Sequence, residues 1–197
     1  MSGNGSNLQA LLDSDDIRPH IHLVVSNRAD AYGLQRAAQA GCPTKTHLRK
    51  DFENRAEFDR ELAKCLEEQQ IDLIVLAGWM HILGEEYLKN APGRTINLHP
   101  ALPGHYPGLN AIERAWNDKR EITGCMVHDV VLEVDAGQVL GTSEVKISEY
   151  QNLASLTTAV HRAEHTLLPR VVREWLGLAS VSKTEQGVPR SLSSEGA

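Results

Sequence analysis

Cysteine is scarce in this chain of 197 residues, and its three cysteines are far apart in the sequence. They are Cys42, Cys65 and Cys125, and no two of them form a Cys-x-x-Cys pair. This spacing argues against a disulfide framework and against a cysteine zinc site. We therefore interpret the three residues as free thiols in a reducing compartment.

Long apolar runs and an excess of positive charge are missing as well. No stretch approaches the length of a membrane-spanning helix, and the N-terminus is polar and rich in glycine, unlike a secretory signal peptide. The net charge of −6 argues against a broad nucleic-acid-binding surface but leaves room for a local basic pocket. We expect a cytoplasmic protein that binds neither membranes nor nucleic acids.

The composition is that of an ordinary globular protein, with 41% hydrophobic and 23% charged residues. The length suits one domain with a hydrophobic core, which we expect to cover residues 1–178. After this range the chain is rich in Ser, Gly, Lys and Glu, and this predicts a flexible C-terminal tail over 179–197.

Apolar runs alternate with amphipathic segments in the first half of the chain. The predicted strands are 21–25, 72–77 and 95–98. The predicted helices begin at Leu8 and cover 31–40, 55–69 and a short stretch around Tyr87. Strands that alternate with helices favour an α/β fold, in which a mostly parallel sheet is flanked by helices.

The second half has a different pattern. Its prolines and glycines between Pro100 and Gly108 predict a structured loop. The β-like runs 124–134 and 139–147 are expected to pair as an antiparallel hairpin or extension. The remaining predicted helices are 111–117 and 153–176, the second of which contains Pro169.

Residues 2–7, Ser-Gly-Asn-Gly-Ser-Asn, lead directly into the helix expected from Leu8. Closely spaced glycines let several N–H groups point inward, and the helix adds its positive dipole end, so this turn suits a phosphate. Gly5, Ser6 and Asn7 are the candidate contacts. The alternative is a flexible terminus in which a Ser or Asn only caps the helix, and a glycine-rich loop alone favours that alternative.

Asn97 and His99 lie at the carboxyl end of the strand expected over 95–98, where open α/β sheets bind their ligands. Side chains two residues apart on a strand point to the same face, so the amide and the imidazole project together. Such a pair can stabilise an oxyanion and move a proton. The alternative is a polar strand end with a hydrogen-bonded imidazole, and the proline-rich loop that follows favours a site.

Asp135 lies at the turn between the two β-like runs. A carboxylate there can orient His99 and raise its pKa, but Asp also begins many turns for structural reasons alone. The spacing leaves these two interpretations equal. His128, on the first run, either lines the same site or packs across the sheet, and we favour the first.

The predicted C-terminal helix contains His161-Arg162-Ala163-Glu164-His165, which matches the His-x-x-Glu-His order of one group of zinc peptidases. His161 and His165 share a helix face, but no third ligand follows on a recognisable segment. We therefore expect no metal site and place these histidines at the surface or at the edge of a pocket.

In order along the chain, residues 2–7, Gly78-Trp79-Met80, 97–103 and 124–137 resemble the glycinamide ribonucleotide formyltransferases. The resemblance extends to about Leu176. Asn-x-His-Pro with a downstream Asp is specific to folate-dependent formyl transferases and hydrolases as a class, and the opening Gly-x-Gly-Ser-Asn is specific to the nucleotide-using member.

The resemblance implies a Rossmann-like formyltransferase fold without a metal. It implies transfer of a formyl group from 10-formyltetrahydrofolate to the amine of glycinamide ribonucleotide, which gives N-formylglycinamide ribonucleotide and tetrahydrofolate in de novo purine biosynthesis. A monomer or weak homodimer is expected.

The resemblance also assigns roles to individual positions. The implied catalytic residues are Asn97, His99 and Asp135. The implied ribonucleotide-binding residues are Gly5, Ser6, Asn7, His161, Arg162, Ala163 and Glu164. The implied folate-binding residues are Arg55, Met80, His81, Ile82, Leu83, Asn97, Leu132, Glu133, Val134 and Asp135.

The sequence departs from the family pattern at several positions. An apolar first strand before Ser2, in the middle of the family's sheet, is missing, so we expect the chain alone to be poorly stable. Position 81 is His where many relatives have Arg, and Ala136 and Gln138 replace a commoner Gly and Pro.

Three alternative functions follow from the resemblance. The first is a catalytically impaired or ligand-binding homologue, which the missing strand favours. The second is a 10-formyltetrahydrofolate hydrolase, although these usually carry an additional N-terminal regulatory domain. The third is a methionyl-tRNA formyltransferase, which needs a C-terminal tRNA-binding domain for which we expect no room after Ala179.

Overall fold

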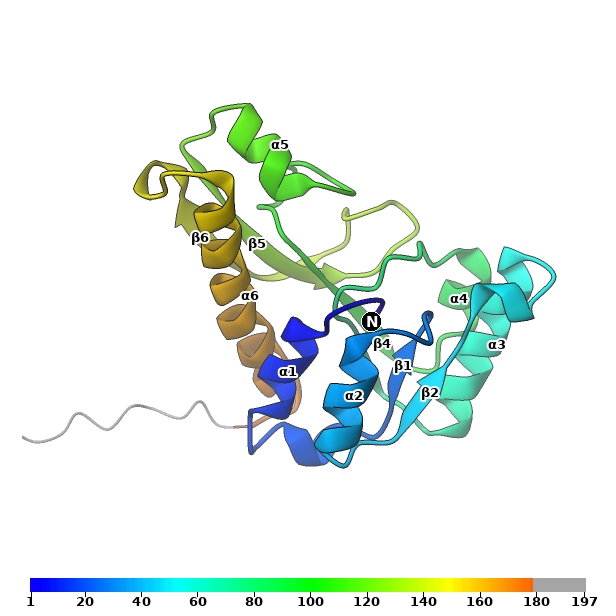
Figure 1. Ribbon diagram of the computed structural model, residues 1–197. Coiled ribbons are helices and arrows are strands. Elements are labelled where there is room, and N and C mark those ends of the chain that lie inside the picture. The colour runs from blue at the N-terminus through cyan, green and yellow to red at the C-terminus, as the bar shows by residue number, and fades with distance from the viewer. Residues whose placement is uncertain (179–197) are drawn as a thin grey trace, which may run out of the picture.

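The computed structural model describes residues 1–178, so the tail expected over 179–197 lies outside the described residues (Figure 1). The helices are α1 (Ser6–Leu12), α2 (Tyr32–Gln39), α3 (Arg55–Glu68), α4 (Glu85–Asn90), α5 (Ala111–Asn117) and α6 (Leu153–Trp175). The strands are β1 (Val24–Ser26), β2 (Thr44–Thr46), β3 (Leu73–Leu76), β4 (Arg94–His99), β5 (Ile122–Asp129) and β6 (Val139–Lys146). Short 3-10 helices are η1 (Arg18–His20), η2 (Arg49–Asp51) and η3 (Ile147–Glu149). Within residues 1–178, every helix is too short or too polar to cross a membrane.

The strands form two sheets. β1 and β2 pair in parallel, whereas β3, β4, β5 and β6 form a second sheet in that order. In the second sheet β3 and β4 are parallel, and the β4–β5 and β5–β6 pairs are antiparallel. Helices pack around both sheets, so the predicted α/β class and the predicted hairpin are confirmed (Figure 1).

One predicted strand extends too far. The run 124–134 was expected to be β-structure throughout, but β5 ends at Asp129. Beyond it the chain turns through Asp135, whose φ is 56°, and Gly137 passes so near Asp129 that a Cβ there would lie 1.8 Å from its carbonyl oxygen. Arg94 binds the Asp129 carboxylate, with its Nη2 2.8 Å from Oδ2. The residues between β5 and β6 are therefore a loop, and this loop carries Asp135.

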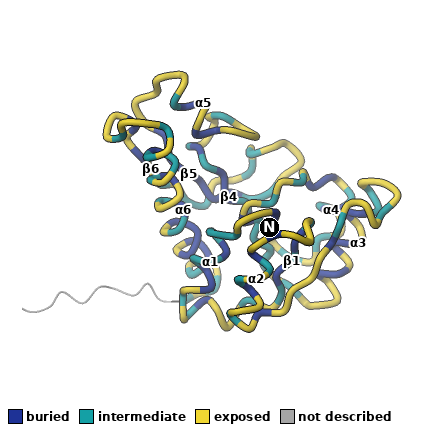
Figure 2. Tube along the Cα trace, in the orientation of Figure 1, coloured by how far each residue is buried: buried dark blue, intermediate teal, exposed yellow. Residues whose placement is uncertain are grey.

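The main core lies between α6 and the sheet of β3 to β6 (Figure 2). Leu156, Val160 and Leu168 of α6 are completely buried, in one cluster with Cys125 and Val127 of β5. Burial of this apolar surface is the main favourable contribution to holding a helix on a sheet. It fixes α6 along the sheet, where α6 also packs against α1.

A second core joins α3 and α4. Phe58 and Leu62 of α3 are buried beside Tyr87 of α4, whose hydroxyl lies 2.9 Å from Thr95 Oγ1 on β4. This contact anchors α4 to β4, the strand that also carries Asn97. The segment between β3 and α4 therefore lies close to the carboxyl end of β4.

An apolar groove of about 280 Å³ separates the two sheets, and residues of β1, β3, α1, α3 and α6 line it. The first residues of the chain lie beside it. The amino group of Met1 donates to the Val25 carbonyl at 2.9 Å, and the Ser2 N–H donates to the Gly78 carbonyl at 2.9 Å. These bonds hold the glycine-rich turn next to the segment that follows β3.

Candidate active site

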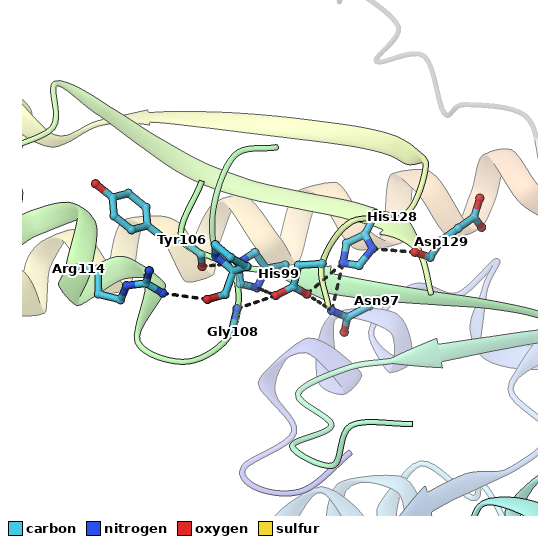
Figure 3. Close-up of polar contacts among 9 residues, drawn as sticks. Asn97, His99, Tyr106, Gly108, Arg114, His128 and Asp129 are labelled. Atoms are coloured by element: carbon cyan, nitrogen blue, oxygen red, sulfur yellow. Dashed lines mark hydrogen bonds and ion pairs between the residues drawn. The ribbon is translucent and has the colours of Figure 1, made fainter. Parts of the chain in front are cut away.

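Four polar side chains meet at the carboxyl end of β4 (Figure 3). Asn97 and His99 come from β4, His128 from β5 and Asp135 from the loop after β5. Asn97 is the ladder partner of His128, which explains why these side chains are neighbours. His99, His128 and Asp135 are all enclosed, with side chains 5%, 3% and 8% exposed. The predicted same-face projection of Asn97 and His99 thus places both against Asp135.

Asp135 is the centre of this cluster. Its Oδ1 accepts a hydrogen bond from Asn97 Nδ2 at 3.2 Å and lies 3.3 Å from His128 Nε2. Its Oδ2 accepts the Gly108 N–H at 2.8 Å and lies 3.3 Å from His99 Nδ1. Burial by itself raises the pKa of Asp135, but the two histidines, through their protonated forms, and the Gly108 N–H outweigh it and hold that pKa below the ordinary value. Asp135 is therefore an anion at neutral pH.

The protonation state of His99 follows from two opposing influences. Its Nε2 lies 3.0 Å from the Tyr106 carbonyl, which can only accept, so Nε2 carries a proton. Burial lowers the pKa of His99, and Asp135 and the Tyr106 carbonyl oppose burial without cancelling it. The ring is therefore neutral at neutral pH, with a lone pair on Nδ1 that faces the Asp135 carboxylate. A second proton would convert this repulsion into a charge-assisted hydrogen bond.

The partners of His128 fix the orientation of Asn97. His128 Nδ1 lies 2.8 Å from the Asp129 carbonyl and donates to it. In the neutral ring Nε2 is then an acceptor, and Asn97 Nδ2 donates to it at 3.2 Å. Both amide protons of Asn97 are thus engaged, one by His128 and one by Asp135, and its carbonyl oxygen points away from them (Figure 3).

The proline-rich loop supplies backbone groups that the sequence analysis did not identify. Tyr106 provides the carbonyl that binds His99, and Gly108 provides the N–H that binds Asp135. Both residues have left-handed backbones, with φ of 48° and 79°. Arg114 of α5 donates to the Pro107 carbonyl at 2.8 Å and holds the loop in this shape. Backbone donors and acceptors carry no side-chain signal, so the sequence indicated only that this loop is structured.

The glycine-rich turn has a structural requirement as well as the predicted chemical one. Gly5 has φ of 77°, and a Cβ there would lie 2.7 Å from the Gly33 Cα on α2. Asn4 is held by Arg36, whose Nη2 donates to its Oδ1 at 2.9 Å. Glycine at position 5 is therefore needed for the close packing of α1 on α2, whatever binds at the turn.

Asn7 joins this turn to α6. Its Nδ2 donates to Glu164 Oε2 at 3.2 Å, while its Oδ1 is buried without a hydrogen-bond partner. His161 donates to the same Glu164 oxygen at 2.8 Å, and this bond raises the pKa of His161. Glu164 is buried, and its charge also acts on His99. The structure thus unites Asn7, His161 and Glu164, and places them near the Asp135 cluster.

Most of the predicted folate contacts lie in two segments, 80–83 and 132–135, whereas Arg55 is on α3 and Asn97 on β4. Met80 and Ile82, after β3, are 68% and 56% exposed, and Leu132 and Val134, after β5, are 55% and 40% exposed. Apolar side chains exposed beside a polar cluster are typical of a ligand-binding surface. Leu83 differs, because the whole residue is 4% exposed within the α3–α4 core, which leaves little of it open to a ligand.

Metal ligands are not gathered at this site. Over residues 1–178 the structure contains no group of three or more His, Cys, Asp or Glu side chains able to hold an ion. His165 makes no hydrogen bond to the His161–Glu164 pair, and its buried Nε2 has no hydrogen-bond partner. The His-x-x-Glu-His pattern of α6 therefore does not form a zinc peptidase centre.

Comparison with known proteins gives a consistent result. The family model described as formyl transferase matches residues 1–172. The phosphoribosylglycinamide formyltransferase of Dictyostelium discoideum is 45% identical over 193 residues, which cover 88% of this chain and 94% of that protein. The trifunctional purine biosynthetic protein adenosine-3 of Homo sapiens is 39% identical, but the match covers only 17% of its length.

Solved structures agree with the sequence relatives. Glycinamide ribonucleotide transformylase 1 from Symbiobacterium toebii superposes with a TM-score of 0.84 at 34% identity, over 90% of this chain and 85% of that one. The expected formyltransferase architecture is thereby confirmed, although half of the strand pairings in this structure are antiparallel.

Proposed function

Because this chain belongs to the formyl transferase family, we propose that it transfers the formyl group of 10-formyltetrahydrofolate to the amine of glycinamide ribonucleotide. The products are N-formylglycinamide ribonucleotide and tetrahydrofolate, and the reaction is a step of de novo purine biosynthesis. The observation that carries the proposal is the enclosed cluster of Asn97, His99 and Asp135 at the carboxyl end of β4. 10-Formyltetrahydrofolate is a co-substrate, and the proposed chemistry uses no metal.

The reaction is a direct acyl transfer. The neutral amine attacks the formyl carbon, the carbonyl electrons move to oxygen, and the resulting tetrahedral intermediate collapses with release of N10 of the folate. One proton leaves the attacking nitrogen and one is gained by N10, so the cluster must move a proton without net gain or loss. His99 and Asp135, with Nδ1 3.3 Å from Oδ2, are the groups able to do so.

The developing oxyanion gives His99 its second role. A negative charge beside a buried neutral imidazole favours its protonation at Nδ1, and this proton, which otherwise faces Asp135, is then donated to the oxyanion. Asn97 is the second candidate donor. Since both of its amide protons are bound by His128 and Asp135 in this structure, it must release one of them to serve the intermediate.

The two substrates are assigned to two different sets of residues around the cluster. We place the ribonucleotide phosphate at the turn 5–7 and its ribose side at residues 161–164, supported by the bond between Asn7 and Glu164. We place the folate at Arg55, 80–83 and 132–135, where the exposed apolar side chains lie.

The remaining proposals concern the whole protein. Residues 1–178 form one formyltransferase domain, and the protein acts in the cytoplasm as a monomer or weak homodimer. The three buried free thiols of Cys42, Cys65 and Cys125 support a reducing compartment. Sedimentation at several concentrations tests the oligomeric state, and localisation of the tagged chain tests the compartment.

The deciding experiment incubates the purified chain with the formyl donor, with and without glycinamide ribonucleotide. We expect donor consumption and N-formyl product only when both are present. Donor consumption at an equal rate without the ribonucleotide would identify a hydrolase. Binding of both ligands without consumption would identify the catalytically impaired homologue.

A further inference from the structure

A second buried carboxylate lies outside the catalytic cluster, on α3. Asp59 is 1% exposed, and its Oδ2 accepts the Gly84 N–H at 2.8 Å. Its other oxygen, Oδ1, is buried without a hydrogen-bond partner. Buried polar atoms are nearly always paired, so this oxygen requires an explanation.

The atom facing this oxygen is also unpaired. His81 Nε2 is buried without a hydrogen-bond partner and lies 3.7 Å from Asp59 Oδ1. This distance exceeds that of a hydrogen bond but is within the range of an ion pair. A small movement of the ring would join the two atoms once Nε2 carries a proton, and a protonated ring gains more from the carboxylate than a neutral one.

A permanent cation completes the cluster. Arg55 lies one helical turn before Asp59, with its Nε 3.7 Å from Asp59 Oδ2. A Cβ at Gly84 would lie 2.8 Å from that oxygen and 3.2 Å from Arg55 Nη2, so the backbone closes this side of the cluster. The side chains of Arg55 and His81 remain 49% and 21% exposed. The carboxylate is therefore enclosed behind two basic groups that solvent reaches.

The charges of this cluster change with the state of His81. With a neutral ring, Arg55 and Asp59 cancel, and with a protonated ring one positive charge is left over. Burial lowers the pKa of His81, Asp59 opposes this effect, and Arg55 and Arg49 of η2 add to it. The ring also packs on Phe58, with centroids 4.6 Å apart. The ring of His47, another titratable group, packs on the same Phe58 side chain, with centroids 4.4 Å apart.

We propose that Asp59 is a positioning residue that allows His81 to bind as a cation, beside Arg55, to a carboxylate of the folate co-substrate, and that this binding takes up a proton. The inference rests on the proposed function, because Arg55 and His81 belong to the predicted folate side. His81 stands between the exposed apolar residues Met80 and Ile82, which suits a ligand that combines aromatic rings with a carboxylate tail.

The direction of the pH dependence follows from the thermodynamic linkage between proton binding to His81 and binding of the folate carboxylate. A bound carboxylate adds negative charge beside His81 and raises its pKa, so the complex holds a proton that the free protein does not. Affinity for the tail-bearing folate is then highest at low pH and falls as pH rises through the pKa of His81 in the complex. Each unit by which binding raises that pKa corresponds to about a tenfold change in affinity.

The experiment measures the dissociation constant of a stable 10-formyl-dideazafolate between pH 5.5 and 8.5. The matched ligand is the same compound with both glutamate carboxylates converted to amides. We expect the acid to bind about tenfold more tightly at the low end of this range and the bis-amide to show no such gain. NMR titration of His81 should show a raised pKa in the complex with the acid only.

Variants separate the role of each residue. His81→Arg fixes the charge and should retain binding while losing the pH dependence. Asp59→Asn should lose both the low-pH gain and the NMR shift, with its folding checked by thermal melting. His22→Gln, which removes an exposed histidine before β1, is the control and should behave as the unchanged protein.

The outcomes distinguish this inference from the proposed function. Equal affinity for the acid and the bis-amide, pH-independent binding, a His81→Arg variant with the full pH dependence, or no binding of the acid at any pH would overturn the inference. The proposed function survives the first three of these results if formyl transfer is observed. Absence of formyl transfer with a normal His81 response would instead overturn the function and leave an anion-binding cluster.

Discussion

Replacement of Asp135 by Asn tests the centre of the proposed catalytic cluster with the smallest change of shape. The carboxylate side chain is 8% exposed and accepts from Gly108 and Asn97 while facing both histidines. An amide keeps one acceptor, which can still bind the Gly108 N–H, but it removes the charge that favours a protonated His99. On general acid–base grounds kcat/KM should fall by about 100-fold or more at neutral pH.

The same replacement should leave the protein folded. Hydrogen bonds to a charged group contribute about 1.5–3 kcal/mol, and relief from burying that charge offsets part of the loss. We expect the free energy of unfolding to fall by about 1–3 kcal/mol, against about 5–15 kcal/mol for an ordinary domain. Thermal melting and steady-state kinetics on the same preparation separate loss of activity from loss of structure.

The pH dependence of stability gives an independent check. The contacts of Asp135 hold its folded-state pKa below the ordinary value, so it stabilises the fold above the unfolded-state pKa of about 3.9. This contribution is lost as pH falls through the folded-state pKa. The stability difference between the two proteins should therefore shrink between about pH 5 and pH 2.

A matched carboxylate provides the control. Asp118 accepts the Tyr106 hydroxyl at 2.9 Å, so it contacts the same loop from outside the cluster. Asp118→Asn should change kcat/KM by less than about threefold, the range of weak surface interactions. An Asp135→Asn variant that keeps more than a tenth of the activity would refute the role assigned to the carboxylate.

Three further predictions concern other parts of the site. His99→Ala should lower kcat/KM by about 100-fold or more in a chain whose circular dichroism is unchanged. Gly5→Ala should lower the free energy of unfolding by about 1–3 kcal/mol in chemical denaturation, because the new Cβ would meet the Gly33 backbone. It should also weaken the binding of both substrates, and a change confined to the KM for the ribonucleotide would contradict this. Glu164→Gln should lower the pKa of His161 in an NMR titration and raise the ribonucleotide KM, whereas an unchanged pKa would show that Glu164 is not its hydrogen-bond partner.

Apolar periodicity predicted most helices and strands of this fold. The helix expected over 111–117 is α5, and the helix expected over 153–176 is α6 to within one residue. Apolar periodicity could not predict β2, because Thr44–Thr46 is exposed throughout and contains no apolar residue. It extended β5 too far because Val130 to Val134 is as apolar as a strand, although Asp135 and Gly137 turn the chain there.

The proposed catalytic side chains were easier to predict than the groups that hold them. Two-residue spacing was enough to place Asn97 and His99 on one face, and the ladder then accounts for His128. Asp135 could not be placed from its spacing, since its contact with His99 depends on a left-handed turn. Asp59 was not identified from the sequence, and only the structure shows that it is buried on α3 and faces His81.

The two histidine–carboxylate pairs obey the same physics at different distances. Burial lowers the pKa of both His99 and His81 despite the carboxylate beside each, so each ring is neutral until a further negative charge arrives. At His99 the carboxylate is 3.3 Å away and the proposed charge is the oxyanion of the intermediate. At His81 the carboxylate is 3.7 Å away and the proposed charge belongs to the bound folate.

Because the charge beside His99 exists only during the reaction and the charge beside His81 throughout binding, Asp135→Asn should lower kcat while Asp59→Asn should raise the folate KM. A variant of Asp59 with normal KM and reduced kcat would place both pairs in the chemical step and refute this division.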